Sequence, residues 1–200
     1  MAQYRFHFHT KSFDAENIDN VIFFTNKCQV YRAKVDDFDC TKASALGDFL
    51  PAKLEMDEGE KPIFMKIQNS YPENENFIFV FENGKGVRVP VSSYQTKGNR
   101  RKLIGAYSDA SPIVSVFYET EPVDILMKST DNKAIVVKSS LIPIKTTRSA
   151  AGVNVFTLKK GNKIASAEVG FEDKFDSKGF KKLKIPAVGV VIPDGEQLSF

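Results

Sequence analysis

Basic side chains crowd one short stretch of this sequence. Four cations lie within the heptapeptide TKGNRRK, residues 96–102, namely Lys97, Arg100, Arg101 and Lys102. Guanidinium and ammonium groups at this density suit a ligand that carries repeated negative charge, such as a chain of phosphates. A solvated loop is the other explanation for such a stretch, so the distribution of charge elsewhere in the chain decides between them.

Charge is segregated along the chain. The net charge of +3 is a weak signal, but acids dominate residues 55–82, whereas residues 85–104 contain six bases and no acid. Residues 128–163 repeat the basic bias against a single acid, Asp131. Segregation of this kind favours a surface that faces a polyanion over an evenly solvated one.

Other residues that could do chemistry are poorly placed for it. His7 and His9 share one face of an expected strand, but no third metal ligand accompanies them. The aspartates of DDFD, residues 36–39, lack the glycine and glutamate spacing of a calcium loop, and ENGKG, residues 82–86, is better explained as a hairpin turn than as a phosphate cradle. We therefore expect no metal, no cofactor and no catalytic residue.

The composition is that of a soluble intracellular protein. Hydrophobic residues make up 42% of 200 positions, enough for one large domain or two small ones. No apolar run approaches the roughly 20 residues that cross a bilayer, so we expect no membrane partner. Cys28 and Cys40 are too few for a disulfide scaffold or a zinc site and are expected to be reduced and structural.

Short apolar runs of alternating character recur throughout the sequence. They are rich in Val, Ile, Phe and Tyr and are bounded by Asn, Gly, Asp and Lys, which is typical of strands and turns. No segment keeps a helical period over three turns. The runs that carry this prediction of an all-β fold are NVIFFTN, CQVYRAKV, NFIFVFEN, GVRVPV, PIVSVFY, AIVVKS and VNVFTL.

Three of the runs form repeats. Each places a polar turn between two apolar strands, with Cys28, Gly84 and Asn132 at the matching turn position. Glycine and asparagine tolerate the positive φ of a tight hairpin, and cysteine does so less readily. Ten residues later each repeat has a large apolar residue, and a glycine follows; these positions are Phe38, Tyr94 and Ile142, then Gly47, Gly105 and Gly152.

A period near 50 residues with about four short strands indicates propeller blades. A β-sandwich is the alternative, although it does not require the same spacing from hairpin to glycine three times over. We assign the repeats to residues 1–170, as units at 18–66, 76–118 and 123–169. Residues 171–200 form a tail that can supply a closing strand.

The repeats resemble those of the C-terminal domain of bacterial DNA gyrase and topoisomerase IV A-subunits. The resemblance covers roughly residues 18–169 and is carried by DNVIFFTNKCQVYRAKV, GEKPIF, FVFENGKGVRVPVSSY and GVNVFTLKKGNKIASAEV. It implies a β-pinwheel, a propeller whose blades exchange strands, with DNA bending around a basic outer rim. The family usually has more blades than the three seen here, so a partial or abbreviated ring is expected.

The resemblance also implies what the chain does and lacks. The glycine- and arginine-rich box of gyrase, of the type QRRGGRG, is absent, and TKGNRRK has similar chemistry without that pattern. The chain thus looks more like a topoisomerase IV subunit or a diverged gyrase paralogue. The resemblance implies a non-catalytic accessory domain in the bacterial cytoplasm, associated with the nucleoid. Its partners would be double-stranded DNA, the ATPase subunit, and the remainder of the polypeptide to which the domain belongs.

Repeated cations are the expected phosphate contacts. Bending a duplex requires neutralised phosphates along a curved path and no reading of bases, so binding is expected to be independent of sequence. Cations recur at matching places in the hairpins and in the loops before the glycines. The predicted contacts are Arg32, Arg88, Lys97, Arg100, Arg101, Lys102, Lys138, Lys145 and Arg148. The alternative function is a propeller that binds an acidic protein partner.

Overall fold

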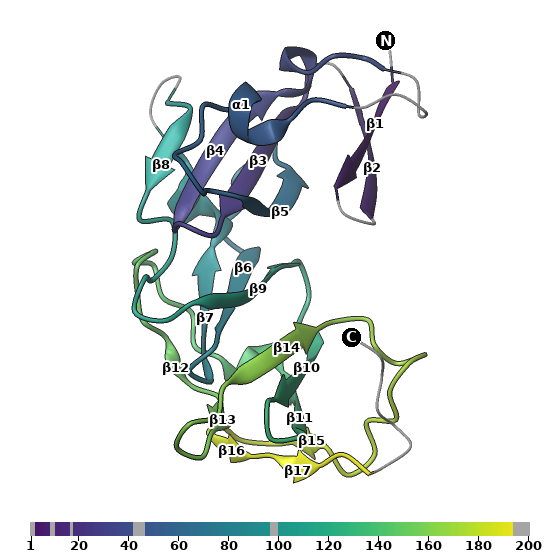
Figure 1. The fold of residues 1–200 in the computed structure, drawn as a ribbon, viewed down its shortest axis with the longest axis vertical. Helices are drawn as coiled ribbons and strands as arrows, with labels where there is room; N and C mark the ends of the chain where they lie inside the picture. Colours follow the sequence, from purple (N-terminus) through teal and green to yellow (C-terminus); the bar gives the residue numbers. More distant parts are fainter. Residues whose placement is uncertain (1–2, 9–10, 17, 42–46, 97–99, 194–200) are drawn as a thin grey trace. The chain divides into compact units, whose positions relative to one another are not determined.

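A computed structural model describes residues 3–8, 11–16, 18–41, 47–96 and 100–193. Strands dominate these ranges, and the one α-helix, α1 (Leu50–Lys53), is a single turn (Figure 1). The all-β prediction is therefore confirmed. The chain forms two compact units, of which the first holds residues 1–71 and 94–106 and the second holds residues 72–93 and 107–200.

The first blade is a four-stranded antiparallel sheet in the first unit. Its order is β5 (Pro62–Ile67), β3 (Asn20–Thr25), β4 (Gln29–Lys34) and β8 (Lys102–Ile104). The inner strand β3 is buried almost throughout, as its β-branched and aromatic residues require. Strand β8 belongs to the second repeat of the sequence, so the first blade is completed by the repeat that follows it.

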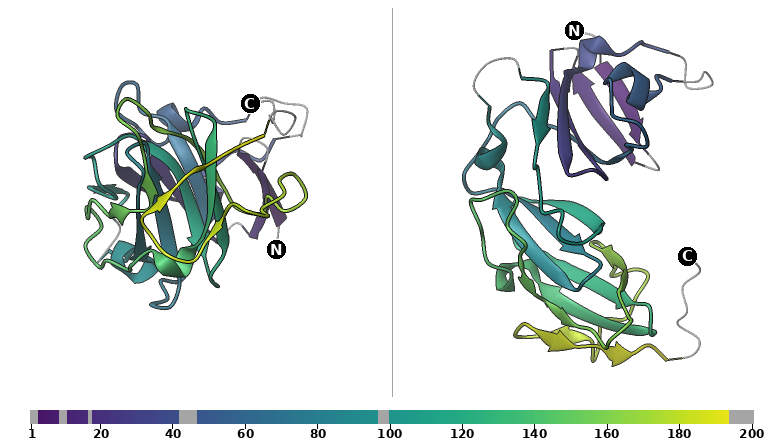
Figure 2. Two further views of the ribbon diagram at one scale, coloured as in Figure 1. Left: turned by 90° about the horizontal axis from the view of Figure 1, so that it is seen from below. Right: turned by 60° about the vertical axis from the view of Figure 1, so that its left-hand side comes forward.

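The second blade repeats this arrangement in the second unit. Its order is β9 (Ile113–Glu119), β6 (Asn76–Phe81), β7 (Lys85–Pro90) and β12 (Val153–Asn154). Strand β12 comes from the third repeat and pairs antiparallel with β7. Exchange of the outer strand between consecutive repeats is the arrangement expected of a β-pinwheel. In the right-hand view of Figure 2 the teal strand β8 lies beside the purple strands of the first blade.

The third blade obtains its outer strands from the C-terminal segment. Strands β14 (Ile164–Glu168), β10 (Asp124–Ser129) and β11 (Lys133–Lys138) form an antiparallel sheet. The free edge of β11 then pairs in parallel with β15 (Lys181–Lys182) and antiparallel with β17 (Val190–Val191).

The hairpin turns adopt the predicted backbone. Cys28, Gly84 and Asn132 have φ values of 56°, 79° and 55°, so the cysteine accepts the left-handed conformation that glycine prefers. Gly84 has a second constraint, because a Cβ atom there would lie 2.4 Å from the carbonyl oxygen of Phe156.

A 3₁₀-helix follows the second strand of each hairpin. These helices are η1 (Val35–Asp37), η2 (Val91–Tyr94) and η3 (Ser139–Leu141). The predicted apolar residues lie at their ends and are buried, with Phe38, Tyr94 and Ile142 exposed by 8% or less. Of the glycines predicted next, Gly105 and Gly152 have positive φ, and Gly47 is not among the positive-φ residues.

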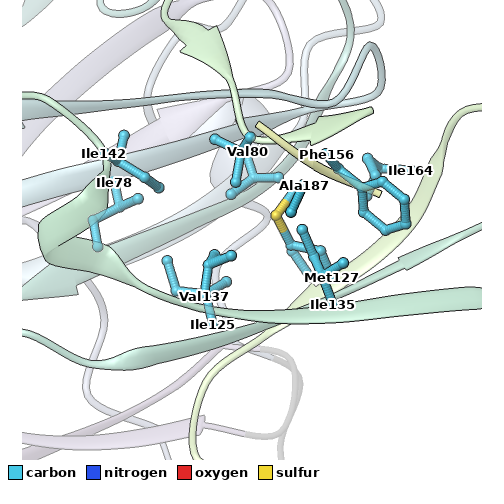
Figure 3. Close-up of a cluster of buried hydrophobic side chains, with 12 residues drawn as sticks. Ile78, Val80, Ile125, Met127, Ile135, Val137, Ile142, Phe156, Ile164 and Ala187 are labelled. Atoms are coloured by element: carbon cyan, nitrogen blue, oxygen red, sulfur yellow. The ribbon is translucent and has the colours of Figure 1, made fainter. Parts of the chain in front are cut away.

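The second and third blades share one core. Side chains from β6 and from the β10–β11 hairpin form a single buried cluster, which includes Val80, Met127 and Ile135 (Figure 3). Phe156, in the short strand β13 (Phe156–Thr157), packs into the same cluster, and β13 pairs with β16 (Ala187–Val188). Strands β1 (Gln3–Phe8) and β2 (Lys11–Glu16) form a separate hairpin.

Candidate nucleic-acid interface

Predicted cations of two repeats lie at the outer edges of their blades. In the first blade the Arg32 backbone N–H donates to the carbonyl oxygen of Arg101 at 2.7 Å. In the second blade the Arg88 carbonyl accepts from the Lys145 backbone N–H at 2.8 Å. The loops that carry Arg101 and Lys145 therefore extend the outer edge of each sheet, beside equivalent arginines of β4 and β7.

The third blade breaks this pattern. At the position that corresponds to Arg32 and Arg88 it has Val136, whose backbone N–H donates to the carbonyl oxygen of Phe180 at 2.9 Å. Both side chains are buried in a small apolar cluster. The outer edge of this blade is thus closed by apolar packing, and the paired cations are a feature of the first two blades.

Arg100 and Arg101 are available to a ligand. Both side chains are exposed immediately before β8. Within the described ranges neither guanidinium forms an ion pair. Lys97, predicted to act with them, lies outside the described residues.

Lys102 is held within the first blade. Its ammonium nitrogen lies 2.9 Å from both carboxylate oxygens of Asp57 and 5.4 Å from the centre of the Tyr31 ring. The hydrogen bond to Asp57 raises the pKa of Lys102, while hydrogen bonds from Gln29 and then Lys102 lower the pKa of Asp57. This lysine fastens the exchanged strand β8 to a loop of the preceding repeat, a role that the sequence prediction did not include.

Arg88 is also engaged by a carboxylate. Its Nε and Nη2 atoms donate to Glu119 Oε2 at 2.8 and 2.7 Å, and its Nη1 lies 3.4 Å from the Ile142 carbonyl oxygen. The side chains of Arg88 and Glu119 are only 12% and 2% exposed. A buried guanidinium paired with a buried carboxylate is a structural group, so we leave Arg88 out of the proposed contacts.

Arg32 has the corresponding position in the first blade but different partners. Its guanidinium donates to the Tyr71 hydroxyl and to the Tyr94 carbonyl oxygen, and it stacks 5.1 Å from the Tyr71 ring centre. Burial raises the pKa of Tyr71, so the hydroxyl is neutral and leaves the arginine charge uncompensated. Sequence reasoning missed Tyr71, which lies 39 positions from Arg32.

The remaining predicted cations differ in their surroundings. Lys145 is exposed, and Lys138 is exposed with its nitrogen 3.9 Å from Asp124. Arg148 is half-buried and donates to the Ser93 carbonyl oxygen at 2.9 Å. Lys145 therefore offers the more available charge of the loop that precedes β12.

Part of the acid-rich segment serves the fold. Glu60 is 2% exposed and accepts hydrogen bonds from the hydroxyls of Thr25 and Tyr31 and from the Asp57 backbone N–H. Burial raises the pKa of Tyr31 within this network. Asp57 and Glu60 thus have structural roles in the first blade.

Neither a metal cluster nor a membrane span emerges from the described part of the chain. No three His, Cys, Asp or Glu side chains there are grouped to hold a metal ion. No helix in the same ranges is long and apolar enough to cross a bilayer. His9 and the side chain of His7 lie outside what the structure describes.

Comparison with known proteins finds similarity to DNA gyrase and DNA topoisomerase IV proteins. The chain is 25% identical over 161 residues to the DNA gyrase A-subunit of Staphylococcus aureus, and the match covers 79% of this chain and 18% of that protein. It therefore spans less than a fifth of the length of these relatives. Among solved structures, the C-terminal domain of DNA topoisomerase IV matches with a TM-score of 0.70 and 22% identity over 80% of this chain and 49% of that chain.

A second solved structure supports the fold, and a family model identifies the family. The Escherichia coli ParC C-terminal domain matches with a TM-score of 0.59 and 12% identity, over 80% of this chain and 65% of that one. The family described as the DNA gyrase C-terminal domain, beta-propeller, matches residues 19–47, 76–104 and 124–169, which together exceed half of the chain. These three segments begin beside β3, β6 and β10, the first strands of the three hairpins. The chain belongs to the family of DNA gyrase C-terminal domains.

Proposed function

We infer that this chain is a non-catalytic DNA-binding domain from the DNA-cleaving polypeptide of a bacterial type IIA topoisomerase. It guides or bends duplex DNA through phosphate contacts that do not depend on sequence. Its proposed partners are the ATPase subunit and the remainder of the DNA-cleaving polypeptide, and the bacterial cytoplasm is its proposed location. The type IIA enzyme supplies the ATP-dependent chemistry outside this domain.

The observation that carries this proposal is the exposure of Arg100 and Arg101 at the outer edge of the first blade. Within the described residues these guanidinium groups have no carboxylate partner, so they remain available for phosphate oxygens. Lys145 occupies the equivalent edge of the second blade. Cations without a carboxylate partner among the described residues, present on each of these two blades, suit a ligand that carries many phosphates.

The test is fluorescence anisotropy with labelled duplexes of about 20 and about 40 base pairs over a salt series, because each phosphate contact adds roughly −0.9 to the slope of log affinity against log salt. The variant is Arg100→Gln with Arg101→Gln. Its slope should be shallower by about 1.8, because two phosphate contacts are lost.

The matched control is Lys174→Gln with Lys178→Gln. It makes the same charge change at two exposed lysines, which lie among Glu172, Asp173 and Asp176. This control should bind as the unaltered chain does. A chain that binds neither duplex at low salt would contradict the proposal.

A second candidate function is a platform for an acidic protein. It is favoured by exposed apolar side chains in the C-terminal segment, where Leu183, Val188 and Val191 are 94%, 67% and 59% exposed. Exposed apolar groups beside lysines suit a protein surface more than a phosphate backbone. Retention of a defined acidic protein after nuclease treatment, with no affinity for the duplexes, would support this candidate over DNA binding.

A further inference from the structure

The first blade contains a pocket that is lined by several hydrogen-bond donors. Three arginines, Arg32, Arg100 and Arg101, line it together with the hydroxyl-bearing residues Tyr71 and Thr96. The other lining residues are Ile22, Val30, Tyr94 and Leu103. No carboxylate lines this pocket among the described residues, so its electrostatic character is that of an anion site.

Two hydroxyl groups in the pocket can still donate a hydrogen bond to a ligand. The Oγ1 atom of Thr96 is buried and has no hydrogen-bond partner within the described ranges. An orphaned buried hydroxyl costs free energy unless a ligand or water satisfies it. Among the described residues the Tyr71 hydroxyl has one hydrogen bond, which it accepts from Arg32, so its own proton is left for another acceptor.

Comparison of the two blades explains why Arg32 has a neutral partner where Arg88 has a carboxylate. In the second blade, Asn76 pairs in register with Glu119, and that carboxylate neutralises Arg88. In the first blade the corresponding residue is Gln68, whose backbone N–H bonds to the Asn20 carbonyl oxygen at 2.8 Å. The carboxylate of one blade is thus replaced by a neutral amide in the other.

We propose that this pocket is a phosphate-binding site, formed by the guanidinium groups of Arg32, Arg100 and Arg101 and the hydroxyls of Tyr71 and Thr96. Arginine forks and hydroxyl donors match the several acceptor oxygens of one phosphate group. A DNA backbone phosphate and a free phosphate ion share this chemistry. The identification of the ligand as a DNA backbone phosphate rests on the function proposed above. The existence of the phosphate site does not depend on that function.

The test is an NMR titration of the full chain with inorganic phosphate at constant ionic strength. The backbone amide signals of Thr96 and Arg101 should shift and saturate. Thr96→Val removes one hydroxyl without changing charge and should weaken the affinity for phosphate several-fold. Arg32→Gln should abolish saturation, and Lys34→Gln, a charge change on an exposed side chain of the same strand, should leave the affinity unchanged.

Shifts that stay linear with phosphate and spread over exposed lysines would overturn the proposal. Equal phosphate affinity in Thr96→Val and the unaltered chain would also overturn it, and this variant gives a result even if Arg32→Gln fails to fold.

A labelled duplex added to the phosphate-saturated chain then separates the two sources. Displacement of phosphate by DNA identifies the backbone as the source. Saturation by phosphate without displacement supports a site for the free ion. Saturation with no duplex binding at all contradicts the proposed function and leaves the phosphate site in place.

Discussion

Arg88 donates hydrogen bonds from two side-chain nitrogens to the same carboxylate oxygen of Glu119, at 2.8 and 2.7 Å. Asn76 donates to that oxygen as well, at 2.9 Å, so the carboxylate has three donors. At the equivalent site of the first blade, Gln68 takes the place of Glu119, and Arg32 donates a hydrogen bond to the Tyr71 hydroxyl. The second blade therefore compensates the charge of its arginine with a carboxylate, while the first blade leaves the arginine charge uncompensated.

Arg88→Gln should destabilise the chain strongly, because it leaves a buried carboxylate without its cation. The expected loss is about 3–5 kcal/mol in the free energy of unfolding. Urea unfolding followed by circular dichroism measures it. Arg88→Gln combined with Glu119→Gln should lose clearly less, since no buried charge remains unpaired; equal losses in the single and double variants would contradict this explanation.

Substitutions at two neighbouring cations should affect different properties, with Arg101 contributing to DNA binding and Lys102 to stability. Arg101→Gln should make the salt slope of duplex binding shallower by about 0.9, because one phosphate contact is lost. Lys102→Gln should leave that slope unchanged and lower the urea midpoint, because its ammonium is already bonded to Asp57. A shallower slope in Lys102→Gln would show instead that this lysine leaves Asp57 to reach DNA.

The Asp57 carboxylate should make the stability of the first blade depend on pH. Hydrogen bonds lower its pKa below the ordinary 3.8, so the folded chain binds this proton less readily than the unfolded chain does. Its contribution is therefore present above pH 3.8 and is lost as the pH falls through the lowered pKa. The urea midpoint of Asp57→Asn should lie below that of the unaltered chain near neutral pH, and the two should converge in acid. A difference in urea midpoint that is the same at every pH would show that the Asp57 carboxylate is not the source of the pH dependence.

Two glycines with positive φ should differ in their response to alanine. Gly84 and Gly161 have φ values of 79° and 88°, but a Cβ atom meets the Phe156 carbonyl only at Gly84. Gly161→Ala should cost about 1–2 kcal/mol for the left-handed backbone alone. Gly84→Ala should cost about 2–5 kcal/mol, because overpacking adds to that strain. Urea unfolding compares them, and equal losses would show that the chain moves aside for the methyl group.

The repeats, the turns and the buried residues after them were predictable from the sequence. Cys28, Gly84 and Asn132 stand at corresponding places in local hairpins, so turn chemistry and alternation suffice to find them. The strand pairs β3–β4, β6–β7 and β10–β11 follow from the same local signal.

The partners of the cations were not predictable in this way. Lys102 bonds to Asp57 across 45 positions, and Arg88 bonds to Glu119 across 31. Such pairs depend on which strands lie together in the folded sheets, and a single sequence does not encode this locally. One signal was available: Gln68 and Glu119 hold matching places in two repeats and differ in charge.

The outer strand of the first blade sets an order of events during synthesis. Strands β3 and β4 can pair as soon as their short turn leaves the ribosome, but β8 is translated about 70 residues after β4, and closing so long a loop costs more entropy than closing a hairpin. Until then the edge of β4 is an unpaired template open to other chains. The sheet of the first blade therefore cannot be completed until β8 of the second repeat has been synthesised. A pause in translation between Lys34 and Lys102 would lengthen the period in which the incomplete blade can aggregate.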